Sequence, residues 1–233
     1  MNHQKQTELI LALDCEDRKI ALELLQSLQG HLKWVKIGLQ MFTAYGLPFV
    51  REIKSMGYNV FLDLKLHDIP NTVAKAVLSL SSASIDLLTI HASGGSEMCA
   101  YAVKARDESN PNLKLLAVTV LTSMNQKQME TLNVSKSVQD QVLDLAQLSI
   151  DAKVDGIVSS THELKLLREN LGSGPLIVTP GIRPKGADLD EQKRVMTPSD
   201  AKQLGADFIV VGRPIYQSKD PLASVISILD DIR

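Results

Sequence analysis

A short run of alternating charges, Asp63-Leu64-Lys65-Leu66-His67-Asp68, contains the residues of this chain best suited to chemistry. Asp63 and Lys65 are two positions apart, so their side chains would point to the same face of an extended strand. Lys36, near the end of an earlier apolar run, could extend the series to an alternating Lys–Asp–Lys–Asp array. In such an array each member favours the charged form of its neighbours. A cation fixed in this way can stabilise negative charge that develops on a substrate and can donate a proton.

The charges alone leave two interpretations open. An isolated Asp-x-Lys pair is at least as typical of a salt-bridge network that closes the top of a barrel as of a catalytic site. Asp68 by itself is more typical of a solvated loop charge, or of a residue near the start of the helix expected at Pro70. The full run over residues 63–72 is far more specific and favours the catalytic interpretation.

Glycine and arginine occur together at two places near the end of the chain. Thr179-Pro180-Gly181-Ile182-Arg183 follows one apolar run, and Gly212-Arg213 follows the last one. Glycine allows backbone N–H groups to approach an oxyanion, and arginine can add two charge-assisted hydrogen bonds. Gly212-Arg213 alone would equally fit a turn glycine beside a surface arginine. Its place after the last expected strand favours a phosphate site.

Short apolar runs must position these residues. The runs are rich in Leu, Ile or Val without strict polar alternation, which is typical of strands buried on both faces of a parallel sheet. The eight runs are residues 9–13, 34–37, 60–64, 87–90, 115–121, 156–158, 176–178 and 208–211.

The segments between the runs are patterned as helices. Ile20, Leu24 and Leu28 repeat at helical spacing, and Asp17 is a plausible N-cap for that helix. Eight strand–helix units in a chain of 233 residues predict an α/β fold, a single-domain (β/α)8 TIM barrel over residues 1–233. An open doubly wound sheet is the alternative. Similar repeats are Val138, Val142 and Leu145, and Ala223, Ile226 and Leu229.

Reactive residues of such barrels lie at the C-terminal ends of the strands. Most polar residues that interrupt the apolar pattern fall there. The polar stretch 185–198 has no clear strand or helix period and is long for a loop, so we expect a functional lid. The strand-end residues are Asp14, Lys36, Asp63, Lys65, His91, Thr122, Ser123, Pro180, Gly181, Arg183, Gly212 and Arg213.

Composition narrows the classes of protein. The net charge of −2 gives no global reason to expect a nucleic-acid or membrane partner. No apolar run approaches the roughly 18–20 residues of a membrane span, and the N-terminus has no signal-peptide pattern. Cys15 and Cys99 lack metal-ligand spacing and are expected to be reduced and buried. These observations predict a soluble, cytoplasmic protein.

Taken in order, these motifs resemble the orotidine 5'-phosphate decarboxylase family, in its bacterial short-chain form. The resemblance covers essentially the whole chain and rests chiefly on Asp63-Leu64-Lys65-Leu66-His67-Asp68-Ile69-Pro70-Asn71-Thr72. Tyr216 is a small departure, since a smaller residue is more usual there. The other shared motifs are Leu13-Asp14, Val35-Lys36-Ile37-Gly38, His91-Ala92-Ser93-Gly94-Gly95, Val118-Thr119-Val120-Leu121-Thr122-Ser123, Thr179-Pro180-Gly181-Ile182-Arg183-Pro184, Gln192 and Val211-Gly212-Arg213-Pro214-Ile215.

The resemblance implies decarboxylation of orotidine 5'-phosphate to uridine 5'-phosphate in pyrimidine biosynthesis, without a cofactor or metal. Lys65 would donate the proton to C6 of the pyrimidine, and Asp63 would lie against the departing carboxylate. Lys36 would bridge Asp63 and the ribose hydroxyls, and Asp14 would also bind the ribose. Asp68 would complete the charged array in the site of a partner subunit, because the family is a homodimer with sites at the interface.

Further substrate contacts are implied in the same way. Thr72 would lie beside Asp68 in the partner's site, and Ile69 would be a further substrate contact. Thr122 and Ser123 would meet the edge of the pyrimidine. The phosphate side of the site, with Pro180 nearby, would be formed by Arg183, Gln192, Gly212 and Arg213.

Two other functions remain as alternatives. Sugar-phosphate decarboxylases and aldolases of the same barrel superfamily resemble this chain in their Asp-x-Lys-x-x-Asp pattern, but they use a divalent metal. Lys36, the residues that follow His67 and the presence of Gln192 argue against them. A non-catalytic sensor of phosphate ligands would require a damaged charge array, whereas all four charged residues are present here.

Overall fold

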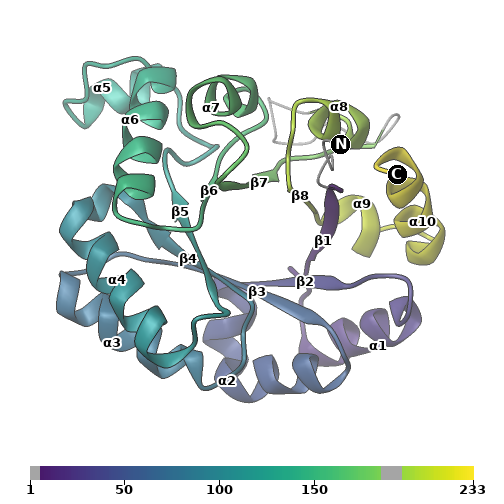
Figure 1. The fold of residues 1–233 in the computed structure, drawn as a ribbon. Helices are drawn as coiled ribbons and strands as arrows, with labels where there is room; N and C mark the ends of the chain where they lie inside the picture. The colour runs from purple at the N-terminus through teal and green to yellow at the C-terminus, as the bar shows by residue number, and fades with distance from the viewer. Residues whose placement is uncertain (1–5, 185–195) are drawn as a thin grey trace.

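The strands close into a parallel barrel in chain order, β1-β2-β3-β4-β5-β6-β7-β8, in a computed structural model that describes residues 6–184 and 196–233. Helices surround the barrel on its outside (Figure 1). The predicted (β/α)8 barrel is therefore confirmed, and the open sheet is excluded. No helix among the described residues is long and apolar enough to cross a membrane.

Each of the eight apolar runs forms a strand. The prediction was least accurate for the fifth run, residues 115–121, because the strand ends at Val118 and the chain turns before Thr122. The strands are β1 (Glu8–Ala12), β2 (Trp34–Gly38), β3 (Asn59–Leu66), β4 (Leu87–His91), β5 (Lys114–Val118), β6 (Gly156–Val158), β7 (Leu176–Pro180) and β8 (Phe208–Val211).

The helices connect successive strands or extend the loops above them. A short 3-10 helix, η1 (Ala92–Gly94), directly follows β4. The α-helices are α1 (Arg18–Leu28), α2 (Leu39–Ser55), α3 (Pro70–Ser81), α4 (Gly95–Ser109), α5 (Gln126–Thr131), α6 (Val138–Asp151), α7 (Leu164–Leu171), α8 (Pro198–Gln203), α9 (Arg213–Tyr216) and α10 (Pro221–Asp231).

The predicted helix after β1 is present, and its predicted apolar face is confirmed in part, because Leu28 is buried but Ile20 is not. Asp17 is its N-cap, as expected, and accepts a hydrogen bond from the Ile20 amide at 2.9 Å. Ile20 itself is exposed, whereas Ala21 and Leu25 are buried against the barrel. Two apolar stripes run side by side on this helix, and only packing against the strands selects between them.

The interior of the barrel holds a small apolar cluster that includes Phe61, Phe208 and Val210, packed against Trp34. Trp34 meets Phe208 edge to face, with ring centroids 5.0 Å apart. Because inward-facing side chains alternate along a strand, Lys36 and Asp63 stand one inward position above Trp34 and Phe61, respectively. The apolar cluster thus lies directly beneath the side chains of Lys36 and Asp63.

Candidate active site

Asp63 is the centre of a charged array at the C-terminal mouth of the barrel. Its carboxylate accepts hydrogen bonds from the Lys65 ammonium at 2.8 and 2.9 Å, and the Lys36 ammonium lies 3.7 Å away. Lys36 also approaches Asp14 at 3.5 Å. The four side chains therefore alternate in sign from strand β1 through β2 to β3. The side chains of Lys36 and Asp63 are each only 13% exposed, so water screens their attraction weakly.

Regular strand alternation does not explain how Asp63 and Lys65 meet. Lys65 has a φ of 52°, in the left-handed region that lysine rarely adopts. The pairing of β3 with β4 also changes register between Leu62 and Leu66. A bulge of this kind redirects side chains and is common beside active sites. The prediction that the two side chains share a site holds, but a bulge with a left-handed residue brings them together.

A cavity of about 220 Å³ opens beside this array. Most of the residues that line it are apolar, with a few polar side chains among them, as in sites for small molecules. Five of the predicted substrate contacts line it, including Thr122 and Pro180. The lining residues are Lys36, Phe61, Asp63, Lys65, Val118, Val120, Leu121, Thr122, Val158, Pro180 and Val210.

The second half of the charged run does not line this cavity. Asp68 is exposed, and its carboxylate accepts a hydrogen bond from the amide of Ile69 at 2.7 Å. Among the described residues Asp68 forms no ion pair. Ile69 is 67% exposed, and Thr72 is exposed as well. A single subunit thus leaves these three residues of the motif unused.

The residues predicted to bind phosphate lie after β7 and β8. Arg183 is buried and donates a hydrogen bond to the carbonyl of Ile182 at 3.0 Å. Gly212 precedes α9, which begins with Arg213. Gln192 and most of the expected lid, residues 185–195, lie outside the described residues.

Tyr216 lies near both this group and Asp14, which is predicted to bind the ribose. Its ring would lie 3.4 Å from a Cβ atom added to Gly212, so a side chain there would crowd it. Burial and the charge of Asp14 raise the pKa of the Tyr216 phenol, while Arg213 and Arg183 act in the opposite direction. The residue that departs from the family pattern therefore lies among four of the predicted substrate contacts.

Two histidines stack on each other near Lys65. His67 and His91 stack with ring centroids 5.1 Å apart, and His91 Nδ1 is 2.6 Å from the Ser93 hydroxyl. Burial lowers the pKa of His91, and His67 and Lys65 lower it further. An imidazole held by a stack and a hydrogen bond, with its pKa lowered, is better suited to organise the loops after β3 and β4 than to act as an acid or base.

Cys15 is next to Asp14 but is poorly suited to act as a nucleophile. Burial, with the charges of Asp14 and Asp17, raises its pKa to about 11. The thiol therefore stays protonated near neutral pH, and a thiol reacts far more slowly than a thiolate.

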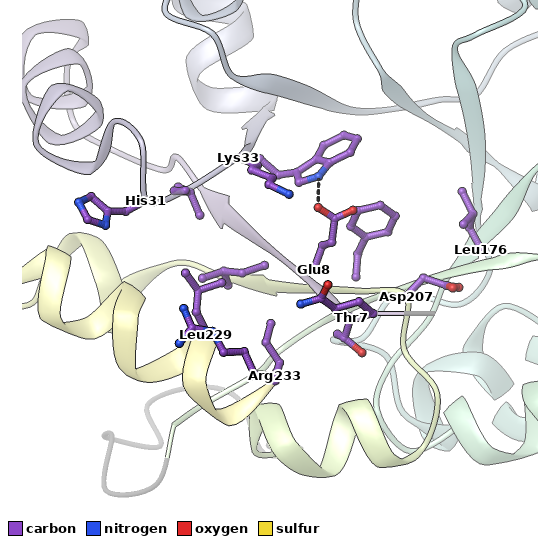
Figure 2. Close-up of a pocket in the computed structure, with 14 residues that line it drawn as sticks. Thr7, Glu8, His31, Lys33, Leu176, Asp207, Leu229 and Arg233 are labelled. Atoms are coloured by element: carbon purple, nitrogen blue, oxygen red, sulfur yellow. Dashed lines mark hydrogen bonds between the residues drawn. The ribbon is translucent and has the colours of Figure 1, made fainter. Parts of the chain in front are cut away.

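A larger hollow, of about 530 Å³, lies at the opposite end of the barrel (Figure 2). Glu8 lines this hollow, and its carboxylate accepts a hydrogen bond of 3.1 Å from the indole nitrogen of Trp34. Catalytic groups of this fold occupy the C-terminal face, and conserved features of the N-terminal face serve stability. The smaller cavity, with its charged array, is the candidate active site.

Thr89 is a site residue that the sequence prediction missed. It is fully buried on β4, and its hydroxyl bonds both Asp63 and the backbone of Lys65. The available signal was a single hydroxyl within the apolar run of residues 87–90.

Comparisons with known proteins identify the family to which this chain is similar. Residues 7–228 match the model of the orotidine 5'-phosphate decarboxylase / HUMPS family. Orotidine 5'-phosphate decarboxylase from Opitutus terrae is 48% identical over 97% of this chain and 98% of its own length. The enzyme of that name from Gluconobacter oxydans is 47% identical over 98% of each chain. The crystal structure of orotidine 5'-phosphate decarboxylase from Lactobacillus acidophilus superposes with a TM-score of 0.88 at 36% identity, covering 97% of this chain and 99% of that one.

Proposed function

Because the chain belongs to the orotidine 5'-phosphate decarboxylase / HUMPS family, we propose that it converts orotidine 5'-phosphate to uridine 5'-phosphate in pyrimidine biosynthesis. The observation that carries this proposal is the Asp63 carboxylate held by the ammonium groups of Lys65 and Lys36 beside an apolar cavity. A decarboxylation that leaves a carbanion needs a fixed cation of this kind.

In the proposed reaction the bond between C6 and the carboxylate breaks, and its electron pair remains on C6 as carbon dioxide leaves. Lys65 stabilises the negative charge and then transfers a proton to C6. Two unit charges about 4 Å apart interact by roughly 4 kcal/mol at an effective dielectric constant of about 20. That energy corresponds to about a thousandfold in rate. The rest of the acceleration must come from binding energy at groups remote from C6.

The groups of the nucleotide that are remote from C6 are bound by separate sets of residues. Asp14 and Lys36 bind the ribose, which their 3.5 Å contact at the rim of the array supports. The pyrimidine lies in the cavity that Pro180 and Thr122 line, and Ser123, the next residue in the chain, also meets its edge. The phosphate is held by Arg183, Gln192, Gly212 and Arg213.

The charge pattern argues for a reaction that does not use a metal. Asp63 is already satisfied by Lys65 and Lys36, and Asp14 is paired with Lys36. A divalent cation would have to compete with ammonium groups for both carboxylates. A metal-dependent sugar-phosphate reaction would therefore require the ion pairs of Asp63 and Asp14 with the lysines to break.

The test follows the ultraviolet absorbance of orotidine 5'-phosphate mixed with the protein and a chelator, without added metal. We expect the absorbance to fall as the product forms. Lys65→Ala should bind uridine 5'-phosphate but lose turnover by about a thousandfold or more. Turnover that depends on added divalent metal, or a Lys65→Ala variant with near-normal rate, would overturn the proposal.

The phosphate assignment has its own test. Arg213→Ala should weaken binding of uridine 5'-phosphate by about tenfold to a hundredfold and leave binding of uridine almost unchanged, because only the nucleotide carries the phosphate dianion. Calorimetric titration with the two ligands measures the difference. Equal losses for both would remove Arg213 from the phosphate site.

We also propose a homodimer in which Asp68, Ile69 and Thr72 of one subunit enter the site of the other. The exposure of all three residues, and the 67% exposure of the apolar Ile69 in particular, support this arrangement. Mixing inactive Lys65→Ala and Asp68→Ala chains should restore about a quarter of wild-type activity, since half of the dimers are mixed and each carries one intact site. No recovery on mixing, or a monomer in sedimentation, would contradict it.

The cytoplasm is the proposed location of the enzyme. Cys15 and Cys99 are both free thiols in the structure, which supports a reducing compartment.

A further inference from the structure

Thr89 joins the two residues at the centre of the array through one oxygen atom. The backbone N–H of Lys65 donates to the Thr89 hydroxyl at 2.8 Å, and the hydroxyl donates to the Asp63 carboxylate at 3.0 Å. A hydroxyl has one proton to give and two lone pairs, so it can make both bonds at once. Thr89 is fully buried and does not line the cavity, so it acts only through its partners.

The bulge in β3 explains why a side chain is needed at this point. Leu62 pairs with Leu88, and Leu66 pairs with Ile90. Strand β3 thus advances four residues while β4 advances two, and Thr89 is the β4 residue opposite the extra segment. Backbone groups in a bulge leave the regular ladder and need other partners. The hydroxyl of Thr89 supplies one inside the barrel.

The same contact fixes an unfavourable backbone. Lys65 has a φ of 52°, and a non-glycine residue remains in this region only where its surroundings hold it there. The bond from Thr89 to the Lys65 amide is such a restraint. The second bond, to Asp63, orients the carboxylate that in turn holds the Lys65 ammonium. Thr89 therefore positions the backbone of Lys65 directly and its side chain through Asp63.

We propose that Thr89 is a positioning residue for the decarboxylation, an inference that rests on the proposed function. It sets the place of the Lys65 ammonium relative to C6 without touching the substrate. Because misplacing a reacting group affects the chemical step more than binding, its loss should lower kcat and leave KM almost unchanged. Losing one hydrogen bond to a charged group should cost about tenfold to a hundredfold in kcat.

The experiment compares Thr89→Val, which keeps the shape and removes the hydroxyl, with Thr89→Ser, which keeps the hydroxyl. Thr7→Val is the matched control, because Thr7 is 3% exposed and its hydroxyl donates one hydrogen bond, of 2.7 Å, to the carbonyl of Ala206 at the other end of the barrel. Steady-state kinetics and thermal midpoints are measured for all three. We expect a low kcat with normal KM only in Thr89→Val, and near-normal kcat in Thr89→Ser and Thr7→Val.

Amide hydrogen exchange of the whole protein gives a reading that does not depend on activity. The Lys65 amide should exchange slowly in the wild type and in Thr89→Ser, and faster in Thr89→Val. Should Thr89→Val fail to fold, Thr89→Ala and Thr89→Ser form a second pair that differs only by the hydroxyl.

Three results would overturn the proposal: a kcat for the hydroxyl-free variant within about threefold of wild type, no rescue by serine, or unchanged exchange at Lys65. A wild-type protein that does not turn over orotidine 5'-phosphate would instead refute the proposed function, and the exchange data would still decide the contact with Thr89.

Discussion

Replacing Lys65 by glycine should give a more stable protein than replacing it by alanine, although both variants lose the proposed proton donor. The left-handed region costs a non-glycine residue about 1–2 kcal/mol, and glycine returns about 0.5–1 kcal/mol of this through its greater freedom in the unfolded chain. Lys65 lies in that region, with a φ of 52°. The net difference of about 1 kcal/mol should raise the melting temperature of Lys65→Gly above that of Lys65→Ala by about 2–4 °C.

Differential scanning calorimetry at one pH and salt concentration measures the two midpoints, and the absorbance assay measures turnover. Lys153 offers a matched control, since it is exposed, has a φ of 68° and lies outside the site. Lys153→Gly should likewise melt above Lys153→Ala, with turnover equal to wild type in both. A Lys65→Ala variant that melts at or above Lys65→Gly would refute the claim that the backbone at Lys65 is strained.

Three further predictions test other parts of the structure. A Cβ at Gly38 would lie 3.0 Å from the Lys36 ammonium, so Gly38→Ala should lower kcat/KM by about tenfold in the absorbance assay and leave the melting temperature nearly unchanged. A Cβ at Gly156 would overlap the backbone oxygen of Leu176, so Gly156→Ala should lower the free energy of unfolding, measured in urea, by about 1–3 kcal/mol. Burial lowers the pKa of His91 from 6.5 in the folded protein. Below that pH the unfolded chain therefore binds a proton more readily than the folded protein, and the free energy of unfolding falls. The urea midpoint of wild type should therefore decline more steeply below about pH 6.5 than that of His91→Asn, and equal slopes would contradict the prediction.

The barrel could be predicted because its strands are buried on both faces. A run such as residues 208–211 has no polar alternation and is too short for a helix, so it indicates a central strand of a parallel sheet. The helical faces were less predictable. Ile20 and Ala21 are adjacent apolar residues, and only their packing against the barrel shows that Ala21 is the buried one.

The end of β5 was placed too late for a related reason. Val120 and Leu121 continue the apolar run, but they line the cavity instead of extending the strand. Apolar residues that form the wall of a binding site give the same pattern as apolar residues in a strand. Sequence alone does not separate the two.

The sequence by itself determined the fold class, the family and three members of the charged array, Lys36, Asp63 and Lys65, because residue types and their order carry those properties. Within the subunit Asp14 is the fourth member, and the place of Asp68 in the array stays a prediction. Only the tertiary structure revealed how the array is held. The bulge in β3 and the left-handed Lys65 break the alternation from which the pairing with Asp63 was predicted. Thr89 is 24 positions from Lys65 along the chain and becomes its hydrogen-bond partner only when β3 and β4 pair. Contacts of this kind depend on strand register, and register is set by the packing of the whole barrel.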